Sequence, residues 1–378
     1  MDLNEIRNEI NAIDDALCSL FVKRMQLSGE VAEVKRQSGK KVFDPARENA
    51  IIERLTQDLS SIDAEAVAEL YQSIFAISRK KQHRLLQKDS ELTQTLRNLI
   101  KNPTELPDTV DVACQGTDGA YSSIACRKLF ANPSTLFFEN FESVFKSVKC
   151  GLSKYGVLPF ENSIYGSVVE VYEKLCNSDV YVVKSVKLPI HHTLLVKKGT
   201  ILSDIREIYS HPQAIGQCGH FLGTLKNVCV TKCLNTALAA RMVAESDRTD
   251  VAAIASEICA ENFGLDILKK DIQNSCTNYT YFYCISKDLE VLEGANKAAF
   301  MFNVANEKGS LADVLSKFSL KNINLTKIES QPIAGRDFEF MFYAEADITG
   351  KTEEILSLFT ELEEELSFFR FIGIYPEV

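Results

Sequence analysis

An apolar residue recurs at every seventh position near the start of the chain, and this repeat limits the fold of that segment more than any other feature. The repeat consists of Ile6, Ile13, Leu20, Leu27 and Val34, with a companion series at Ile10, Leu17 and Val31. Because an α-helix turns once every 3.6 residues, the two series form one stripe along a helix over residues 3–36. A single helix cannot bury such a stripe, so the pattern predicts a helical dimer.

Two further helices follow this one. Asp44-Pro45 predicts the start of a helix to about residue 59, because Asp is a favoured N-cap and proline fits the first turn. Ser61-Ile62-Asp63 predicts the cap of a third helix, whose apolar stripe is Val67, Leu70, Tyr71, Ile74 and Ile77. We therefore predict an all-α domain over residues 1–90. A linker over 91–108 is expected to follow, because Asn102-Pro103 and Leu106-Pro107 lie there.

From residue 109 onward, short apolar runs alternate with helical periodicity. The runs lie at 110–113, 155–158, 181–183, 193–196, 208–209 and 251–254. This alternation predicts an α/β domain over 109–290 with a largely parallel sheet. Over 296–378 the pattern predicts strands at 298–304, 324–330, 339–346 and 369–375, with helices at 310–321 and 352–366. The order β-α-β-β-α-β predicts a ferredoxin-like α+β module, so the chain is expected to be multidomain.

Charge and cysteine content exclude several classes of function. The chain has 42 Lys and Arg against 52 Asp and Glu, a net charge of −10, which disfavours nucleic-acid binding. Its 11 cysteines are scattered, as expected for free thiols in a reducing cytosol. No secretory signal follows Met1, and no run of about 18 apolar residues exists, so we expect a cytoplasmic protein without a membrane span. Cys218, His220, Cys229 and Cys233 fit no strong zinc signature, and no metal is expected.

Cations enter the predicted helical core. Arg24 occupies a position of the stripe where an apolar side chain is expected, and Lys35 lies about three turns later on the same face. A buried arginine could simply form an ion pair with Glu48 or Asp44. The alternative is a bound dicarboxylate, held by several cations together. The candidate cations are Arg7, Arg24, Lys35 and Arg47.

Together with the run Ile6-Arg7-Asn8-Glu9-Ile10-Asn11-Ala12-Ile13-Asp14, these residues resemble the all-helical chorismate mutases. The resemblance implies an intertwined dimer that rearranges chorismate to prephenate. It also implies that the partner subunit's Arg7, with Arg24 and Arg47, binds the two carboxylates. Lys35 and Gln82 would bond the ether oxygen, where negative charge develops in the transition state. The residues implied to hold the hydroxyl side or the substrate pose are Asp44, Glu48 and Ser78.

Polar motifs in the α/β segment lie next to predicted strands, where ligands bind in such sheets. The glycine-containing turn 115–122 follows a strand and opens a helix, and it could bind an anion or be a plain tight turn. Glu161-Asn162-Ser163 follows another strand, although Asn162 or Ser163 could serve only as an N-cap. Two more motifs are Ser210-His211-Pro212-Gln213 and Asn278-Tyr279-Thr280, the second expected after a helix and before a strand at 281–285.

These blocks resemble the prephenate dehydratases. The resemblance implies two α/β subdomains, arranged as in periplasmic binding proteins, with the site in the cleft between them. Prephenate loses its ring carboxylate and hydroxyl together, and Thr280 is implied as the donor to the leaving hydroxyl. The residues implied to line the cleft are Glu161, Asn162, Ser163, Ser210 and Gln213.

One position departs from the dehydratase pattern. The family motif Asn-x-Thr-Arg-Phe has Tyr281 in place of arginine here, and tyrosine offers one donor and no charge. Either another cation replaces it, with Lys184 and Arg127 as candidates, or the dehydratase activity is weakened.

The C-terminal segment resembles ACT regulatory domains at Gly309-Ser310-Leu311 and at 322–330. Such domains pair side by side, and the resemblance implies a phenylalanine effector. The residues implied to bind it are Gly309, Ser310, Leu311, Asn324 and Leu325. Gln331 departs from the family's Glu-Ser-Arg-Pro, so weaker feedback is one expectation, and a purely structural dimerisation module is another.

Together the resemblances imply a bifunctional enzyme of phenylalanine biosynthesis, inhibited by L-phenylalanine, without a cofactor and at least a homodimer. Its substrates would be chorismate and prephenate. One alternative is a dehydratase that prefers arogenate. Another is a mutase joined to a weakened dehydratase that acts as an amino-acid sensor.

Overall fold

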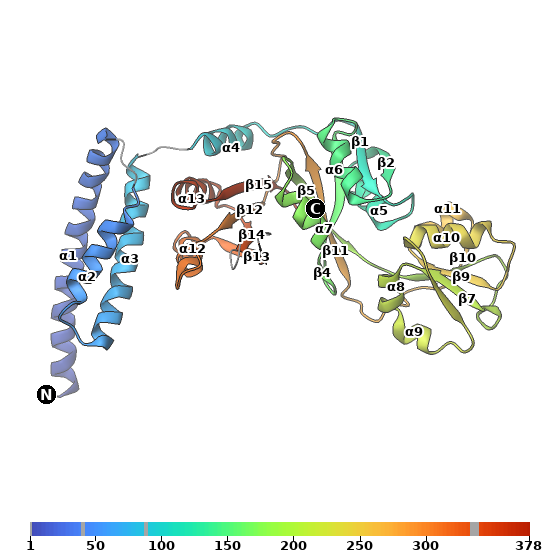
Figure 1. The fold of residues 1–378 in the computed structure, drawn as a ribbon, viewed down its shortest axis with the longest axis horizontal. Helices are drawn as coiled ribbons and strands as arrows, with labels where there is room; N and C mark the ends of the chain where they lie inside the picture. The colour runs from blue at the N-terminus through green and yellow to red at the C-terminus, as the bar shows by residue number, and fades with distance from the viewer. Residues whose placement is uncertain (1, 39–41, 87–89, 333–339) are drawn as a thin grey trace. The chain divides into compact units, whose positions relative to one another are not determined.

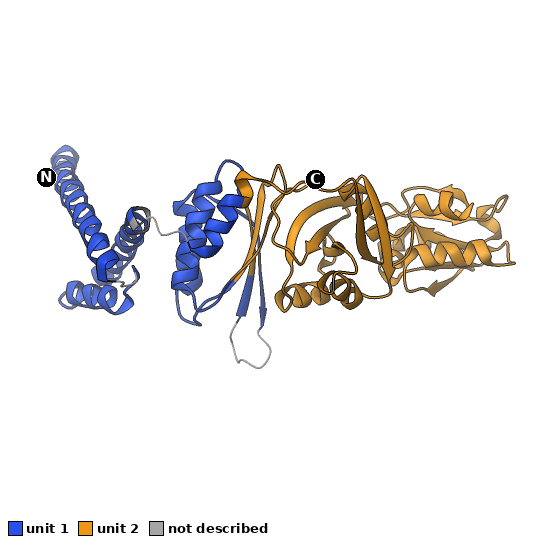
Figure 2. Ribbon diagram, turned by 90° about the horizontal axis from the view of Figure 1, so that it is seen from above, with its two compact units in different colours: residues 1–98, 302–342, 348–369 blue, residues 99–301, 343–347, 370–378 orange. Residues whose placement is uncertain are grey.

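The computed structural model describes residues 2–38, 42–86, 90–332 and 340–378, without the side chains of 83, 84 and 86 (Figure 1). The described chain divides into two compact units, coloured in Figure 2. One unit is made of residues 1–98, 302–342 and 348–369, and the other of 99–301, 343–347 and 370–378. Within the described ranges, no helix is both long and apolar enough to span a bilayer.

The N-terminal segment is helical, as predicted. Helix α1 spans Leu3–Ser38, α2 spans Pro45–Thr56 and α3 spans Ser61–Leu86. Asp44 caps α2, and its side chain accepts a hydrogen bond from the Arg47 amide at 3.1 Å. Two boundaries differ from the prediction. Helix α2 ends three residues before Leu59, and the cap of α3 is Ser60, whose hydroxyl accepts from the Asp63 amide at 3.2 Å.

The apolar stripe of α1 is not covered within one chain. Ile13 is 59% exposed, Leu20 65% and Val34 64%. Helix α1 packs on α3 through a different set of side chains, the buried Met25, Ser28 and Ala32. A continuous exposed row of leucine, isoleucine and valine of this length is unfavourable in water, so the stripe is a surface available for a second helix.

The predicted linker at 91–108 is not irregular throughout. Helix α4 spans Glu91–Lys101, and Leu96 on it is fully buried. The Thr93 hydroxyl oxygen lies 3.2 Å from that of Thr360, and Arg97 forms an ion pair with Glu353. The linker prediction missed this helix because polar residues separate its apolar residues. Leu92, Leu96, Leu99 and Ile100 nevertheless share one helical face.

The α/β segment forms two sheets, which confirms the prediction of two subdomains. The first has the order β2-β1-β3-β11-β5, with β4 paired to β3, and the second has the order β10-β6-β9-β7-β8. The strands of the first sheet are β1 (Thr109–Gln115), β2 (Asn132–Phe138), β3 (Tyr155–Asn162), β4 (Gly166–Ser167), β5 (Tyr181–Pro189) and β11 (Tyr279–Ser286). The strands of the second are β6 (Thr193–Val196), β7 (Glu207–Ser210), β8 (Cys229–Lys232), β9 (Val251–Ala255) and β10 (Asp266–Lys269).

The sheets are mixed, so the prediction of a largely parallel sheet is wrong. Strand β11 lies between β3 and β5 and is antiparallel to both, because the chain returns with it from the second subdomain. In the second sheet β6 is antiparallel to β9 and β10, whereas β7 is parallel to β8 and β9. The segment before β11 consists of turns after β10, so Asn278 does not follow a helix as predicted.

Helices cover both sheets. The helices of the first subdomain are α5 (Tyr121–Leu129), α6 (Phe141–Lys149) and α7 (Val169–Cys176). The helices of the second subdomain are α8 (Pro212–Gln217), α9 (Gly219–Gly223), α10 (Thr236–Glu245) and α11 (Ile258–Phe263). This subdomain also has a 3₁₀ turn at Leu202–Asp204. Each subdomain has its own apolar core, one around Val157 and Phe282 and the others around Leu195 and Ile208.

The C-terminal segment has the predicted order β-α-β-β-α-β. Its elements are β12 (Lys297–Asn303), α12 (Ser310–Leu320), β13 (Asn324–Pro332), β14 (Phe340–Asp347), α13 (Thr352–Glu365) and β15 (Phe369–Tyr375). The four strands form one sheet in the order β13-β14-β12-β15. The predicted strands and helices of this module agree with the structure to within two residues, except that residue 339, where one strand was predicted to begin, lies outside the described residues.

Candidate active sites

A buried polar cluster lies between α1 and α3. The hydroxyl oxygens of Ser28 and Ser78 are 2.5 Å apart, and the Gln82 side-chain nitrogen donates to Ser28 at 3.1 Å. All three side chains are at most 7% exposed. Ser78 and Gln82 were expected at a site here, whereas Ser28 was missed. Its spacing could have revealed it, because Ser28 lies four residues after Arg24 and seven before Lys35, on the same face.

Arg24 is half-buried beside this cluster and makes no ion pair with any described residue. Its guanidinium lies 5.3 Å from the centre of the Phe75 ring. The possible ion-pair partners are engaged elsewhere, since Glu48 pairs with Arg79 and Asp44 accepts from the Arg47 amide. The alternative that Arg24 is neutralised by Glu48 or Asp44 is therefore wrong, and Arg24 remains available to an anion.

The remaining cations expected at the mutase site lie farther out. The Lys35 ammonium donates to the Val42 carbonyl at 2.5 Å, just before α2 begins. Arg47 and Arg7 are exposed. Arg7 precedes Arg24 by 17 residues of one helix, about 25 Å at 1.5 Å per residue, so one chain cannot bring both to a small ligand.

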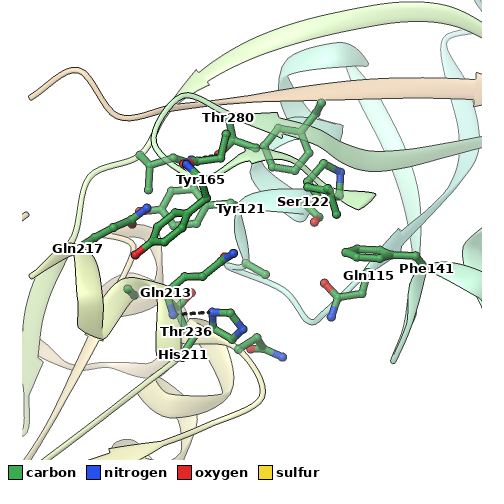
Figure 3. Close-up of a pocket in the computed structure, with 18 of the residues that line it drawn as sticks. Gln115, Tyr121, Ser122, Phe141, Tyr165, His211, Gln213, Gln217, Thr236 and Thr280 are labelled. Atoms are coloured by element: carbon green, nitrogen blue, oxygen red, sulfur yellow. Dashed lines mark hydrogen bonds between the residues drawn. The ribbon is translucent and has the colours of Figure 1, made fainter. Parts of the chain in front are cut away.

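The α/β part contains a cavity of about 560 Å³ lined by residues of both subdomains (Figure 3). Of the residues expected there, Thr280, Asn162 and Gln213 line it. The lining residues that sequence reasoning did not assign to the site include Gln115, Tyr121, Ser122, Phe141, Tyr165, His192, His211, Gln217, Leu234 and Thr236.

Thr280 lies near the start of β11, and its hydroxyl is held by one amide. The Asn162 side-chain nitrogen lies 3.0 Å from the Thr280 oxygen, and it also donates to the Asn278 side chain and the Tyr279 carbonyl. The Asn162 oxygen accepts from the amides of Ile164 and Tyr165, which fixes the orientation of the side chain. Since the Thr280 oxygen already accepts a hydrogen bond, its proton is free to donate to a molecule in the cavity.

Three other expected cleft residues do not line the cavity. Ser210 is fully buried, and its hydroxyl donates to the Ile254 carbonyl at 2.7 Å. The Ser163 hydroxyl donates to the Thr277 carbonyl and accepts from the Tyr279 amide, both at 2.9 Å. Glu161 pairs in register with Tyr281 of β11 and Ser167 of β4, outside the cavity lining. The two serines instead fix the backbone around Thr280 and His211.

Among the residues that the structure describes, no Lys, Arg, Asp or Glu lines the cavity. Instead, four helices of eight residues or more begin at it: α5 at Tyr121, α6 at Phe141, α7 at Val169 and α10 at Thr236. Helix starts carry free amide hydrogens and partial positive charge, which favour anions. The starts of α5 and α7 have no side-chain cap hydrogen bond, and in the first turn of α7 the Val171 amide bonds to the Val168 carbonyl at 2.9 Å. The glycine turn before α5 was the sequence signal for this feature.

Two histidines of the lining are neutral. His192 is 2% exposed and its Nε2 lies 2.6 Å from the Gln217 side-chain oxygen, so Nε2 carries the hydrogen. Burial lowers the pKa of His192, and it also lowers the pKa of His211. The His211 Nδ1 accepts from the Gln213 amide at 3.3 Å (Figure 3). The cavity therefore presents dipoles and hydrogen-bond donors rather than full charges.

Tyr281 does not face the cavity. Thr280 and Phe282 line it, and successive residues of a strand point to opposite faces. The Lys187 ammonium lies 5.5 Å from the centre of the Tyr281 ring. The proposed substitute cations are elsewhere: Lys184 donates to the Leu129 carbonyl at 2.7 Å, and Arg127 pairs with Asp118 at 2.6 Å. The expectation that Lys184 or Arg127 supplies the missing charge is therefore wrong.

The residues expected to bind an effector lie at two ends of one helix. Gly309 has φ of +90°, which favours glycine, and it directly precedes α12. Asn324 and Leu325 begin β13 after α12 ends. The 11 residues of α12 separate the two groups by about 16 Å. Gln331 donates to the Glu329 side chain at 3.2 Å.

Comparisons with known proteins cover both candidate sites. The chorismate mutase type II family model matches residues 6–83, and the prephenate dehydratase model matches 112–290. The chain is 36% identical over 279 residues to arogenate dehydratase/prephenate dehydratase 2 of Arabidopsis thaliana, covering 71% of this chain and 73% of that protein. A structure of prephenate dehydratase from Arthrobacter aurescens in complex with L-Phe is similar over 70% of this chain and 90% of that one. Its TM-score is 0.62, and the two sequences are 26% identical.

Similarity also extends over almost the whole length. The bifunctional chorismate mutase/prephenate dehydratase of Escherichia coli strain K12 is 30% identical over 379 residues, covering 98% of this chain and 95% of that protein. The chain therefore belongs to the family of bifunctional chorismate mutase/prephenate dehydratases.

Proposed function

We propose that this chain catalyses two consecutive reactions and is regulated by a third domain. The helical domain (1–90) rearranges chorismate to prephenate, and the α/β domain (109–290) converts prephenate to phenylpyruvate, carbon dioxide and water. The ferredoxin-like module (296–378), an ACT domain by its motifs, binds L-phenylalanine. The observation that carries the proposal is the Thr280 hydroxyl, held by Asn162 with its proton free for the cavity.

The dehydration needs little covalent chemistry from the protein. The bond between the ring and its carboxylate breaks, and its electrons move through the ring as the hydroxyl on the opposite carbon leaves. One proton from solvent completes the water, and aromatisation drives the reaction. Thr280 donates a hydrogen bond to the departing oxygen, where negative charge develops. Asn162 strengthens that donor by bonding to the Thr280 oxygen.

Prephenate carries two carboxylates, and the starts of α5 and α7, which have no side-chain cap, offer them backbone amides. Gln213, His211 and Thr236 add neutral polar groups on the opposite wall. Since one carboxylate is lost as neutral carbon dioxide, a fixed cation beside it would stabilise the substrate more than the transition state. Dipoles that bind more weakly suit this reaction better. Ser163 and Ser210 support the walls rather than contact substrate.

Chorismate rearrangement requires cations that hold the two carboxylates and a hydrogen-bond donor at the breaking C–O bond. Arg24 and Arg47 hold the carboxylates, while Lys35 and Gln82 bond the ether oxygen, and Asp44, Glu48 and Ser78 fix the pose. Because Arg7 lies about 25 Å along α1 from Arg24, the second carboxylate is met by the partner subunit's Arg7. A dimer that pairs two α1 helices also covers the exposed apolar stripe.

Phenylalanine binding likewise needs two copies of the module. Gly309, Ser310 and Leu311 lie at one end of α12 and Asn324 and Leu325 at the other, about 16 Å apart. Antiparallel pairing of two modules would bring one group of each copy together at an interface. The L-Phe complex of the Arthrobacter aurescens relative supports phenylalanine as the ligand.

Arogenate is a second candidate substrate, because the Arabidopsis relative is named for both dehydrations. Arogenate has an ammonium group where prephenate has a ketone. Within the described part of the chain, no carboxylate lines the cavity to pair with that ammonium, which favours prephenate.

The experiment that tests the proposal incubates the full chain with chorismate and follows chorismate, prephenate and phenylpyruvate separately. Accumulation of prephenate would contradict the second activity, and unchanged chorismate would contradict the first. The same assay with arogenate compares the two dehydrations. Faster turnover of arogenate than of prephenate at equal concentration would reverse the substrate preference.

A further inference from the structure

Three tyrosine hydroxyls and one carboxylate meet where strand β11 packs against β14 and β15. The Tyr283 hydroxyl donates to Glu345 at 2.8 Å, and the Tyr375 hydroxyl donates to the same carboxylate oxygen at 2.8 Å. The Tyr343 hydroxyl lies 2.7 Å from that of Tyr283 and donates to it. We call these four residues, Tyr283, Tyr343, Tyr375 and Glu345, the tyrosine–glutamate cluster.

The cluster is buried, and its carboxylate forms an ion pair with Lys297. Tyr343 and Tyr375 are fully buried and Tyr283 is 3% exposed. Burial holds the pKa of each tyrosine well above its ordinary range, so all three remain donors. Burial alone would raise the pKa of Glu345, but Lys297 at 3.0 Å and the two donating hydroxyls lower it. A satisfied buried network of this kind has one favoured arrangement, because each displaced group would lose its partner.

The cluster is attached directly to the strand that carries Thr280. Tyr283 follows Thr280 by three residues on β11 and points to the opposite face. Its ring stacks on Phe160 of β3 at 4.2 Å between centres, two residues before Asn162. The ring centres of Phe160 and Tyr343 are 5.1 Å apart. The two residues that position the reactive hydroxyl, Thr280 and Asn162, therefore lie on two strands that both pack on Tyr343.

The last residues of the chain are closely docked on the same sheet. A Cβ atom on Gly373 would lie 2.0 Å from the Val182 carbonyl oxygen, so β15 approaches β5 as closely as only glycine permits. The Ser185 amide donates to the Pro376 carbonyl at 3.0 Å, and Ser185 accepts from the Val378 amide at 3.0 Å. Strand β5 pairs with β11, with Ser185 in register with Tyr283. Packing this tight transmits a shift of β14 or β15 to β11 rather than absorbing it.

We propose that Tyr283 is a positioning residue through which the C-terminal module sets the place of the Thr280 hydroxyl. Phenylalanine bound to the module slows dehydration along this route, a step that rests on the proposed function. The effector acts by binding two arrangements of the module unequally, and the tyrosine–glutamate cluster is the element that links those arrangements to β11.

The test compares Tyr283→Phe with a matched control in the full chain. Tyr155→Phe removes an equivalent buried hydrogen bond in the same sheet, because the Tyr155 hydroxyl donates to Glu290 at 2.7 Å. The measured quantity is the ratio of prephenate turnover without and with saturating L-phenylalanine. Equilibrium dialysis measures the phenylalanine Kd, and the thermal unfolding midpoint of each variant reports whether it folds.

In Tyr283→Phe we expect this ratio to fall from its wild-type value to about one, while the Kd changes less than about three-fold. Tyr155→Phe keeps the wild-type ratio. Tyr375→Phe removes the other hydroxyl donor to Glu345 and is expected to behave like Tyr283→Phe. If Tyr283→Phe fails to fold, the ratio measured in Tyr375→Phe tests the proposal. A wild-type ratio in both folded cluster variants would overturn the proposal.

Failure of the proposed regulation is a separate outcome. If phenylalanine does not slow the wild-type enzyme, that part of the proposed function is wrong. The positioning role of Tyr283 is then tested by the rate of prephenate turnover without phenylalanine. The role then requires Tyr283→Phe to lower kcat for prephenate about ten-fold with KM nearly unchanged, and Tyr155→Phe to change neither. An unchanged kcat in Tyr283→Phe would overturn the positioning role as well.

Discussion

The Asn162 side-chain nitrogen donates to the Thr280 hydroxyl oxygen at 3.0 Å, which leaves the hydroxyl proton able to donate to a molecule in the cavity. The pair joins the end of β3 to the start of β11, two strands separated by more than a hundred residues of sequence. The direction of this hydrogen bond matters for the proposed chemistry, because a hydroxyl that donates to the protein cannot donate to the leaving group.

Reversing that hydrogen bond should abolish dehydration without removing Thr280. In Asn162→Asp the carboxylate accepts from Thr280 and turns its proton away, so prephenate turnover should fall about 10²–10⁴-fold, as in Thr280→Val. Thr280→Ser keeps the hydroxyl and should retain most activity. Asn132→Asp is the control, since it adds the same charge at an exposed residue at the start of β2, outside the cavity lining. Full activity in Asn162→Asp would show that the hydroxyl proton is not used.

Restoring the arginine of the family motif should have little effect. Tyr281 faces away from the cavity, so Tyr281→Arg should change kcat and KM for prephenate by less than about two-fold, because no contact with substrate is gained. Steady-state kinetics on purified variant and wild type measure this. A rise of ten-fold or more in kcat/KM would mean that the side chain at 281 reaches the substrate, contrary to its placement.

Mixing two inactive mutase variants should restore activity. Lys35→Ala and Arg7→Ala are each expected to lower chorismate turnover about 10³-fold, because Lys35 is proposed to bond the ether oxygen and Arg7 to hold a carboxylate. If a site combines Lys35 of one chain with the partner's Arg7, a mixed dimer contains one intact site. An equal, re-equilibrated mixture should then recover about a quarter of wild-type activity.

The control for this mixture is Lys23→Ala, an exposed lysine on the same helix, which should leave the mutase rate unchanged. No recovery in a mixture shown to exchange subunits would contradict a site that combines Lys35 of one chain with the partner's Arg7. Dehydratase activity of each variant should stay at the wild-type level, because the cavity in the α/β domain lies on other elements.

The stability of the α/β domain should decrease as the pH falls below 6.5. Burial lowers the pKa of His192 below its ordinary value of 6.5, so the folded protein keeps it neutral while the unfolded chain takes up a proton. Stability present above pH 6.5 is therefore lost as the pH falls toward the lowered pKa. Thermal unfolding of His192→Asn should show a shallower pH dependence between 7 and 5. His220→Asn, at an exposed histidine, should match wild type.

A buried ion pair should contribute strongly to the stability of the C-terminal module. Lys321 and Glu361 are each 5% exposed, with the ammonium and carboxylate 2.7 Å apart. Lys321→Met leaves an unpaired buried carboxylate and should lower the free energy of unfolding by about 3–5 kcal/mol. The double variant Lys321→Met/Glu361→Leu should recover most of this loss. Lys308→Met, at an exposed lysine of the module, is the control, and chemical denaturation measures all three.

The sequence by itself determined the local elements. The seven-residue repeat gave the length of α1 because helix periodicity is a property of neighbouring residues. Asp44-Pro45 gave the start of α2 because a cap acts within one turn. In the C-terminal module, alternation gave each strand to within two residues. Family motifs gave Thr280, Asn162 and Gln213, which do meet in one cavity.

The tertiary structure alone decided which segments become neighbours. Strand β11 was predicted, but its insertion antiparallel between β3 and β5 depends on a chain path through the second subdomain. That insertion turns Tyr281 away from the cavity and places Tyr283 against Tyr343 and Glu345. Ser163 and Ser210 carry the expected residue types, yet their hydroxyls bond to backbone carbonyls. These positions depend on pairing between strands that are distant in the sequence, and local sequence patterns do not indicate such pairing.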